Sequence, residues 1–167
     1  EYILSERLPQ QDLRNGWFPH LQDQLLPGEM ITWIALYDKG RCIAAQTRKR
    51  LYWEHSQLTS SGVTGYSGAN MTINRKDVHE MCEKAVKSVD QKPNGAIGAD
   101  MVIDTDGTPK ITEIQSSRFY TSTYPLALLG LNFPHLYVEC ARGSQLDAHD
   151  SINPCEEGMI YIQRFGA

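Results

Sequence analysis

Apolar residues follow two different periods along this chain, and each period predicts a different kind of element. The β-branched and aromatic run MITWIALY at 30–37 predicts a strand. The short DKG loop at 38–40 reverses the chain, and RCIAAQTR at 41–48 predicts the return strand of a hairpin. The stretch at 60–70 holds three glycines and no period, which indicates a mobile loop and a candidate lid.

A helical period comes next. Apolar residues at the spacing of one helical face predict a helix near 75–89. The residues of this stripe are Val78, Met81, Cys82, Ala85, Val86 and Val89. Asn74 is the predicted N-cap, and KPNG at 92–95 ends the helix.

The second half of the chain predicts another hairpin, two short helices and a last strand. These elements are strands near 96–104 and 109–115, helices near 124–129 and 133–142, and a strand at 159–165. Pro125 suits a first helical position, Asn132 an N-cap and Gly143 a C-terminal stop. The order hairpin, helix, hairpin, helices favours an α+β domain built on an antiparallel sheet.

Composition narrows the class of protein. The chain has 167 residues, which is about one domain, and a net charge of -4, so bulk charge does not favour a nucleic-acid partner. No apolar run approaches the roughly 18 residues of a membrane span, and no signal peptide is visible. The four cysteines lack C-x-x-C spacing, which favours reduced thiols and a cytoplasmic location.

Two acids stand out in the second hairpin. TDGT at 105–108 predicts a two-residue turn centred on Asp106 and Gly107. That turn would set Asp100 directly opposite Glu113, with their Cβ atoms about 4.5–5.5 Å apart. Gln115, two residues after Glu113, would point to the same face. The pairing requires a loop with an even number of residues.

Opposed carboxylates destabilise a sheet unless something offsets their charge. A divalent cation would do so, and oxygen ligands of this kind suit Mg²⁺ or Mn²⁺. Val102 and Ile111 are expected on the same face, where they would suit a flat aromatic ring. The alternative is an acidic pair on a solvated hairpin face.

The stretch GADMVIDTDGTPKITEIQSSRFYTSTYPLALLGLNFPHLYVECARG at 98–143 resembles the C-terminal part of ATP-grasp enzymes, especially their carbamoyl-phosphate-synthase-like branch. Upstream, LLPGEMITWIALYDKGRCIAAQTRKRL at 25–51 resembles the hinge, hairpin and basic strand end of that family. The resemblance implies the ATP-grasp C-terminal subdomain, an antiparallel sheet with helices packed on one face. It also implies a division into three parts: an irregular lead-in or a remnant of the N-terminal ATP-grasp part at 1–22, the subdomain at 23–143, and a tail at 144–167.

The resemblance assigns roles residue by residue. It makes Asp100 and Glu113 metal ligands, with Gln115 as a third ligand where the family has Asn. Arg118 would meet the terminal phosphate or an acyl-phosphate. The nucleotide would contact the hinge and its surroundings, which are Asp23, Gln24, Leu26, Glu29 and Val102.

Two further arginines are candidates for the reacting groups. Arg48 and Arg50 are two residues apart, so they point to one face of a strand end. Guanidinium groups bind phosphate and carboxylate well, so this pair is a candidate for holding phosphate or substrate. The alternative is a solvated basic face.

The implied activity is that of an ATP- and Mg²⁺-dependent ligase. It would activate a small carboxylate, or bicarbonate, as an acyl-phosphate for attack by an amine or another nucleophile. A homo-oligomer is compatible with this class. One alternative is a degenerate, non-catalytic ATP-grasp module, which is favoured by Gln115, by Met30 at the usual ribose-binding position, and by the missing phosphate-binding lysines. Another is an α+β interaction domain whose acids are surface residues.

Overall fold

The computed structural model describes residues 29–55, 58, 67–116, 118–146 and 151–162. Within these ranges, six strands form one antiparallel sheet in the order β5-β4-β1-β2-β3-β6. The strands are β1 (Met30–Asp38), β2 (Arg41–Trp53), β3 (Ser67–Ile73), β4 (Gly95–Ile103), β5 (Pro109–Ser116) and β6 (Ile160–Ile162). The helices are α2 (Lys76–Val89), α3 (Thr123–Leu128) and α4 (Phe133–Arg142).

The first hairpin forms as predicted. Lys39 and Gly40 make a two-residue turn between β1 and β2, and both have positive φ, at 51° and 88°. Two positive φ angles give the turn a twist that matches the twist of the strands. β2 continues to Trp53, which is five residues beyond the predicted end.

The predicted loop at 60–70 is wrong for its last four residues. Ser67–Asn70 belong to β3, which pairs with β2 through partners such as Arg50 and Asn70. Serine, glycine and asparagine are weak strand formers, so pairing with neighbouring strands overrides their local preference. Residues 59–66 of that loop lie outside the described ranges.

α2 confirms the predicted helix and its end at Val89 but corrects its N-cap. Arg75 is the N-cap, and Asn74 instead donates a hydrogen bond from Nδ2 to the carbonyl of Cys155 at 3.4 Å. Val78, Cys82 and Val86 are buried, whereas Val89 is 84% exposed. Val89 is the last residue of the helix, after which the chain leads into β4.

The second hairpin reaches the predicted pairing by a different route. Its loop contains three residues, because the Asp104 amide bonds to the Thr108 carbonyl at 2.8 Å and Gly107 has a φ of 85°. An odd loop would move Glu113 out of line with Asp100. A bulge follows between the pairs Met101–Ile111 and Asp100–Glu113, and it restores the predicted partners.

The remaining elements match the expected order. The Asn132 side chain accepts from the His135 amide at 3.1 Å and caps α4, and Gly143 ends α4 with a φ of 79°. Pro125 is the third residue of α3, not the first as predicted. β6 begins at Ile160 and pairs with β3, while residues 163–165 of the predicted last strand lie outside the described ranges.

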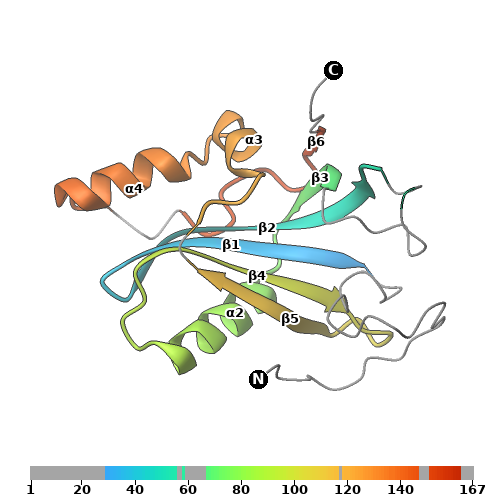
Figure 1. Cartoon of the computed structure of the whole chain (residues 1–167), viewed down its shortest axis with the longest axis horizontal. Coiled ribbons are helices and arrows are strands. Elements are labelled where there is room, and N and C mark those ends of the chain that lie inside the picture. Colours follow the sequence, from blue (N-terminus) through green and yellow to red (C-terminus); the bar gives the residue numbers. More distant parts are fainter. Residues whose placement is uncertain (1–28, 56–57, 59–66, 117, 147–150, 163–167) are drawn as a thin grey trace.

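The core has two main parts, one on each face of the sheet. One face, called here the α2 face, packs against the helix through side chains such as Trp33, Tyr37 and Cys82. The opposite face carries Ile34 and Leu36, which pack under α3 and α4 at one end of the sheet. Figure 1 shows α2 on one side of the sheet and α3 and α4 on the other.

The predicted α+β fold class, an antiparallel sheet with helices packed on it, is therefore confirmed. The prediction placed the helices on one face, whereas α2 packs on one face and α3 and α4 pack on the other. No helix in the described ranges is both long enough and apolar enough to cross a membrane. The part of the sheet face opposite α2 that lies beyond α3 and α4 carries polar side chains, and it contains the candidate site.

Candidate functional site

The two acids lie on neighbouring strands with the register that the sequence predicted. Asp100 of β4 pairs with Glu113 of β5 on one side and with Thr32 of β1 on the other. Directly paired residues of antiparallel strands project to the same face. This face, called here the acid face, is opposite the α2 face because the flanking residues Ala99 and Met101 belong to the α2 cluster.

Asp100 is buried and forms an ion pair with Arg50. Its Oδ1 accepts from Thr32 Oγ1 at 2.8 Å and forms an ion pair with Arg50 Nη2 at 2.6 Å. Arg50 also donates from Nε to Thr32 Oγ1 at 3.0 Å, and its guanidinium lies 5.0 Å from the centre of the Trp53 ring. In this state Arg50 therefore offsets the charge of Asp100, a role that the sequence analysis gave to a divalent cation.

Arg48 points to the same face, as predicted, but sits deeper. It is 3% exposed, and its guanidinium donates to Asn70 Oδ1 on β3. Burial lowers the pKa of Arg48, and the nearby Tyr161 acts in the opposite direction. The alternative of a solvated basic face is therefore wrong for Arg48, which is buried beside Asn70 of β3 and Tyr161 of β6.

The end of β5 brings the other predicted residues together. Glu113 is exposed and Gln115 is half-buried on the same face. Arg118 donates from Nε to Gln115 Oε1 at 3.0 Å, so the predicted phosphate ligand and the predicted third metal ligand are in contact. Tyr120 follows, and its ring lies against Gly98 of β4.

An apolar pad lies beside the acids. Val102 and Met30 are paired across β4 and β1, are both buried, and pack with Trp53. Val102 thus has the surroundings expected of a residue that contacts a flat ring. Ile111 does not share this face, because it packs against the α2 cluster, so that part of the prediction is wrong. The bulge adds one residue to β5, so the alternation of side chains between the two faces shifts by one residue across it.

The hinge residues are described only in part. Glu29 is exposed, forms an ion pair with Lys49, and accepts the Ile103 amide through its carbonyl at 2.9 Å. Asp23, Gln24 and Leu26 lie outside the described ranges. The ribose and hinge roles therefore stay predictions.

The donors on the acid face are compatible with a hard divalent cation. Among the described residues, no group of three His, Cys, Asp or Glu side chains could hold a metal, so the site offers two carboxylates and one amide. Mg²⁺ commonly uses one or two carboxylates and completes its shell with water and phosphate. The two bonds that the Asp100 side chain makes to Thr32 and Arg50 both fall on Oδ1, so Oδ2 takes part in neither of them.

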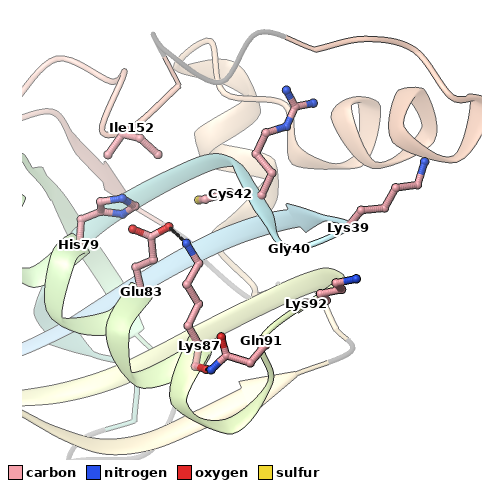
Figure 2. Close-up of a pocket in the computed structure, with 10 residues that line it drawn as sticks. Lys39, Gly40, Cys42, His79, Glu83, Lys87, Gln91, Lys92 and Ile152 are labelled. Carbon is pink, nitrogen blue, oxygen red and sulfur yellow. Dashed lines mark hydrogen bonds and ion pairs between the residues drawn. The ribbon is translucent and has the colours of Figure 1, made fainter.

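A separate cavity of about 570 Å³ lies on the α2 face, away from the acids (Figure 2). Lys87 pairs with Glu83 there at 2.8 Å, and His79 Nδ1 accepts from Trp33 Nε1 at 3.2 Å. Burial raises the pKa of the Cys42 thiol to about 12, so it is no nucleophile at neutral pH. The amino groups of Lys39 and Lys92 point outward in Figure 2, so they do not converge on a ligand.

Sequence reasoning missed several residues of the site. Thr32 and Trp53 position Arg50, Asn70 holds Arg48, and Tyr120 covers Gly98. Thr32 faces Asp100 across β1 and β4, and this register cannot be read from either strand alone. The signal for Tyr120 was Gly98, because a glycine inside a strand often marks the close approach of another group.

Comparison with known proteins gives structural matches only. No family model matches this chain, and no curated protein matches it. Biotin carboxylase from Campylobacter jejuni, solved as a β,γ-ATP complex, aligns with a TM-score of 0.56 and 14% identity over 74% of this chain and 27% of that chain.

Two other solved structures extend the comparison. Carboxyaminoimidazole ribonucleotide synthase from Aspergillus clavatus, complexed with ATP, aligns with a TM-score of 0.54 and 14% identity, over 79% of this chain and 33% of that one. L-amino acid ligase from Bacillus licheniformis aligns with a TM-score of 0.51 and 16% identity, over 72% of this chain and 29% of that one.

All three matches are ATP-grasp enzymes, and this chain spans between 27 and 33% of their lengths. At these identities the likeness is one of fold. The partial coverage fits the C-terminal portion that the sequence resemblance implied. The chain therefore has the fold of part of these ATP-grasp enzymes.

Proposed function

We propose that this chain supplies the nucleotide- and metal-binding part of an ATP- and Mg²⁺-dependent ligase. The enzyme would activate a carboxylate, or bicarbonate, as an acyl-phosphate, which an amine or another nucleophile then attacks. The supporting observation is that paired acids, two arginines and an apolar pad lie together on one sheet face, beyond the part that α3 and α4 cover.

Each part of the acid face has a separate task in this proposal. Val102 and Met30 pack against the adenine ring, and Asp100, Glu113 and Gln115 hold Mg²⁺. When bound, the cation neutralises phosphate charge and favours phosphoryl transfer. Arg50 and Arg118 place positive charge where negative charge develops, which is the main contribution that a protein makes to such a transfer.

Nucleotide binding requires that two internal contacts change. Arg50 must weaken its ion pair with Asp100, and Arg118 must break its hydrogen bond to Gln115. Both arginines then have free donors for phosphate oxygens or for the substrate carboxylate. The side chains that form these internal contacts are thus available to bind the ligand.

The test is calorimetry of the complete protein with ADP, with and without Mg²⁺. We expect Mg²⁺ to strengthen binding, and we expect Asp100→Asn and Glu113→Gln to remove that increase. Asp106→Asn is the matched control, since Asp106 is an exposed acid of the same hairpin whose turn contact asparagine can keep. Equal binding by all variants, or no nucleotide binding at all, would contradict the proposal.

Turnover separates the proposal from the degenerate module. A ligase releases phosphate from ATP when carboxylate and nucleophile are present, and Glu113→Gln stops this release. Binding of Mg²⁺-nucleotide without phosphate release from any carboxylate would instead support a non-catalytic module. The substrates, the cytoplasmic location and the oligomeric state stay predictions.

A further inference from the structure

Gly98 and Tyr120 form a close contact at the edge of the candidate site. A Cβ atom built at position 98 would overlap Cε2, Cζ and the hydroxyl oxygen of Tyr120. Gly98 pairs with Gln115 on β5 and lies two residues before Asp100, so the contact is on the acid face. The glycine thus leaves room for the hydroxyl end of the ring beside the acids.

The Tyr120 hydroxyl is buried and has no hydrogen-bond partner among the described residues. A buried polar group without a partner is unfavourable, and native structures contain few of them. The rest of the residue is well anchored, because its carbonyl accepts the Thr123 amide at 3.0 Å and Thr123 Oγ1 at 2.7 Å. The carbonyl of Tyr120 therefore has hydrogen-bond partners, whereas its hydroxyl has none among the described residues.

The charged groups of the site affect the pKa of this hydroxyl. Burial raises the pKa of Tyr120 most, Asp100 and Glu113 raise it further, and Arg118 and Arg50 lower it. The phenol therefore keeps its proton at neutral pH and can act only as a donor toward an anionic group. The contact with Gly98, opposite Gln115 and two residues before Asp100, places that donor at the proposed nucleotide site.

The order of residues along β4 suggests which ligand atom it meets. Val102 of the apolar pad, Asp100, and Gly98 under Tyr120 are successive residues on the acid face, about 6–7 Å apart at each step. A nucleotide whose ring lies on the pad and whose phosphates pass Asp100 has its last phosphate near Gly98. The unpartnered donor lies at that end.

We propose that Tyr120 donates its phenolic hydrogen to an oxygen of the terminal phosphate of the bound nucleotide, and that Gly98 is required to seat it there. This inference rests on the proposed function. It assigns to Tyr120 a role in distinguishing a triphosphate from a diphosphate, because only the triphosphate carries the oxygen that the hydroxyl meets.

The test compares Tyr120→Phe with the parent protein in the binding of two ligands. We expect the affinity for Mg²⁺ with a non-hydrolysable ATP analogue to fall about tenfold, the effect of one lost hydrogen bond to a charged group. The affinity for Mg²⁺-ADP should be unchanged. The melting temperature without ligand should stay the same or rise, because the variant removes an unpartnered buried hydroxyl.

Two further variants serve as controls. Tyr124→Phe removes the hydroxyl of a tyrosine that is mostly exposed, and both affinities should stay at the parent values. Gly98→Ala displaces the Tyr120 ring and should reproduce the selective loss of the triphosphate analogue. A lower melting temperature of Tyr120→Phe with no change in either affinity would show a structural role and overturn the inference.

The two proposals fail in different ways. If the parent protein binds neither nucleotide, the proposed function itself is wrong. If the parent binds both and Tyr120→Phe loses affinity for both equally, or for neither, only the role of Tyr120 is wrong.

Discussion

Arg50 makes the contacts that connect the side chains of the acid face. It bridges Asp100, Thr32 and Trp53, and the side chains of the ion pair are only 9% and 8% exposed. Lys49, its neighbour in the chain, forms a much more exposed pair with Glu29 on the opposite face of the strand. Adjacent residues thus provide one buried and one exposed ion pair.

We predict that Arg50→Met lowers the free energy of unfolding by about 3 kcal/mol, since it leaves a buried carboxylate without its charge partner. Lys49→Met should lower it by less than about 1 kcal/mol, because water screens that pair. Urea unfolding at neutral pH measures both. Equal losses of unfolding free energy for the two variants would mean that the buried Asp100 carboxylate is not stabilised by Arg50.

The same variant tests whether a cation can replace the arginine. In Arg50→Met, Mg²⁺ or Mn²⁺ should raise the melting temperature more than it does in the parent protein, because Asp100 is then available without competition. Asp100→Asn in the same background should remove this gain. If the gain persists in the double variant, the cation binds elsewhere.

The sequence predicts which side chains belong to the site better than it predicts the contacts that they make. The sequence indicated Asp100 and Glu113 as an opposed pair, because a hairpin relates its two strands locally. It did not indicate Thr32, whose contact with Asp100 joins residues 68 positions apart. The sequence indicated Arg48 and Arg50 as one pair, but their surroundings differ. Arg48 is buried beside residues of β3 and β6, whereas Arg50 pairs with Asp100.

Among the elements, α2 follows its sequence pattern most closely. Its stripe of apolar residues predicts the face that packs on the sheet, and Val78, Cys82 and Val86 are buried there. Val89 has the same spacing but lies at the helix end and is exposed. Periodicity predicts which side of the helix faces the sheet, but it does not predict that the last residue on that side is exposed.

We predict that Val86→Ala destabilises the protein by about 2 kcal/mol, through lost burial and the cavity that remains. Val89→Ala makes the same chemical change on an exposed residue and should change stability by less than about 0.5 kcal/mol. Denaturant unfolding distinguishes the two. A similar loss for both would mean that burial against the sheet does not explain the effect, because alanine is the better helix former at either position.

The second hairpin shows why a correct pairing does not prove a correct turn. The sequence predicted a two-residue turn, but the structure has a three-residue loop with Gly107 at positive φ. A bulge at Thr112 then restores the partners, and Thr112 Oγ1 donates to the Asp100 carbonyl at 3.0 Å. Bulges depend on packing against neighbouring elements, so local sequence rules do not predict them.

For the molecule as a whole, the tail after α4 completes the sheet. Asn153 lies beside the middle of β2, where its amide donates to the Ala45 carbonyl at 2.7 Å and its side chain accepts the Thr47 amide at 2.9 Å. The buried Gln46 accepts the Cys155 amide at 3.1 Å. The sequence analysis placed only a last strand in this tail, because such irregular contacts have no sequence period.

Buried titrating groups limit stability at both ends of the pH range. Burial raises the pKa of Cys42 and Cys82 to about 12, so above about pH 9 the unfolded chain loses protons that the folded chain keeps, and stability falls. Burial lowers the pKa of His79, so below about pH 6.5 the unfolded chain gains a proton and stability falls again.

We therefore predict a plateau of unfolding free energy between about pH 6.5 and 9, measured by urea unfolding across the range. Cys82→Ala should make the decline above pH 9 shallower, and His79→Gln should do the same below pH 6.5. Slopes that neither variant changes would show that other groups control the pH dependence.

The contact between Gly98 and Tyr120 also has a consequence for evolution. Any side chain at position 98 displaces the ring, so the two positions are not free to change independently. Among homologous proteins, an aromatic residue at position 120 should occur only with glycine at position 98, and a larger residue at 98 should accompany a small one at 120. A selection that randomises both positions should recover the same pairs.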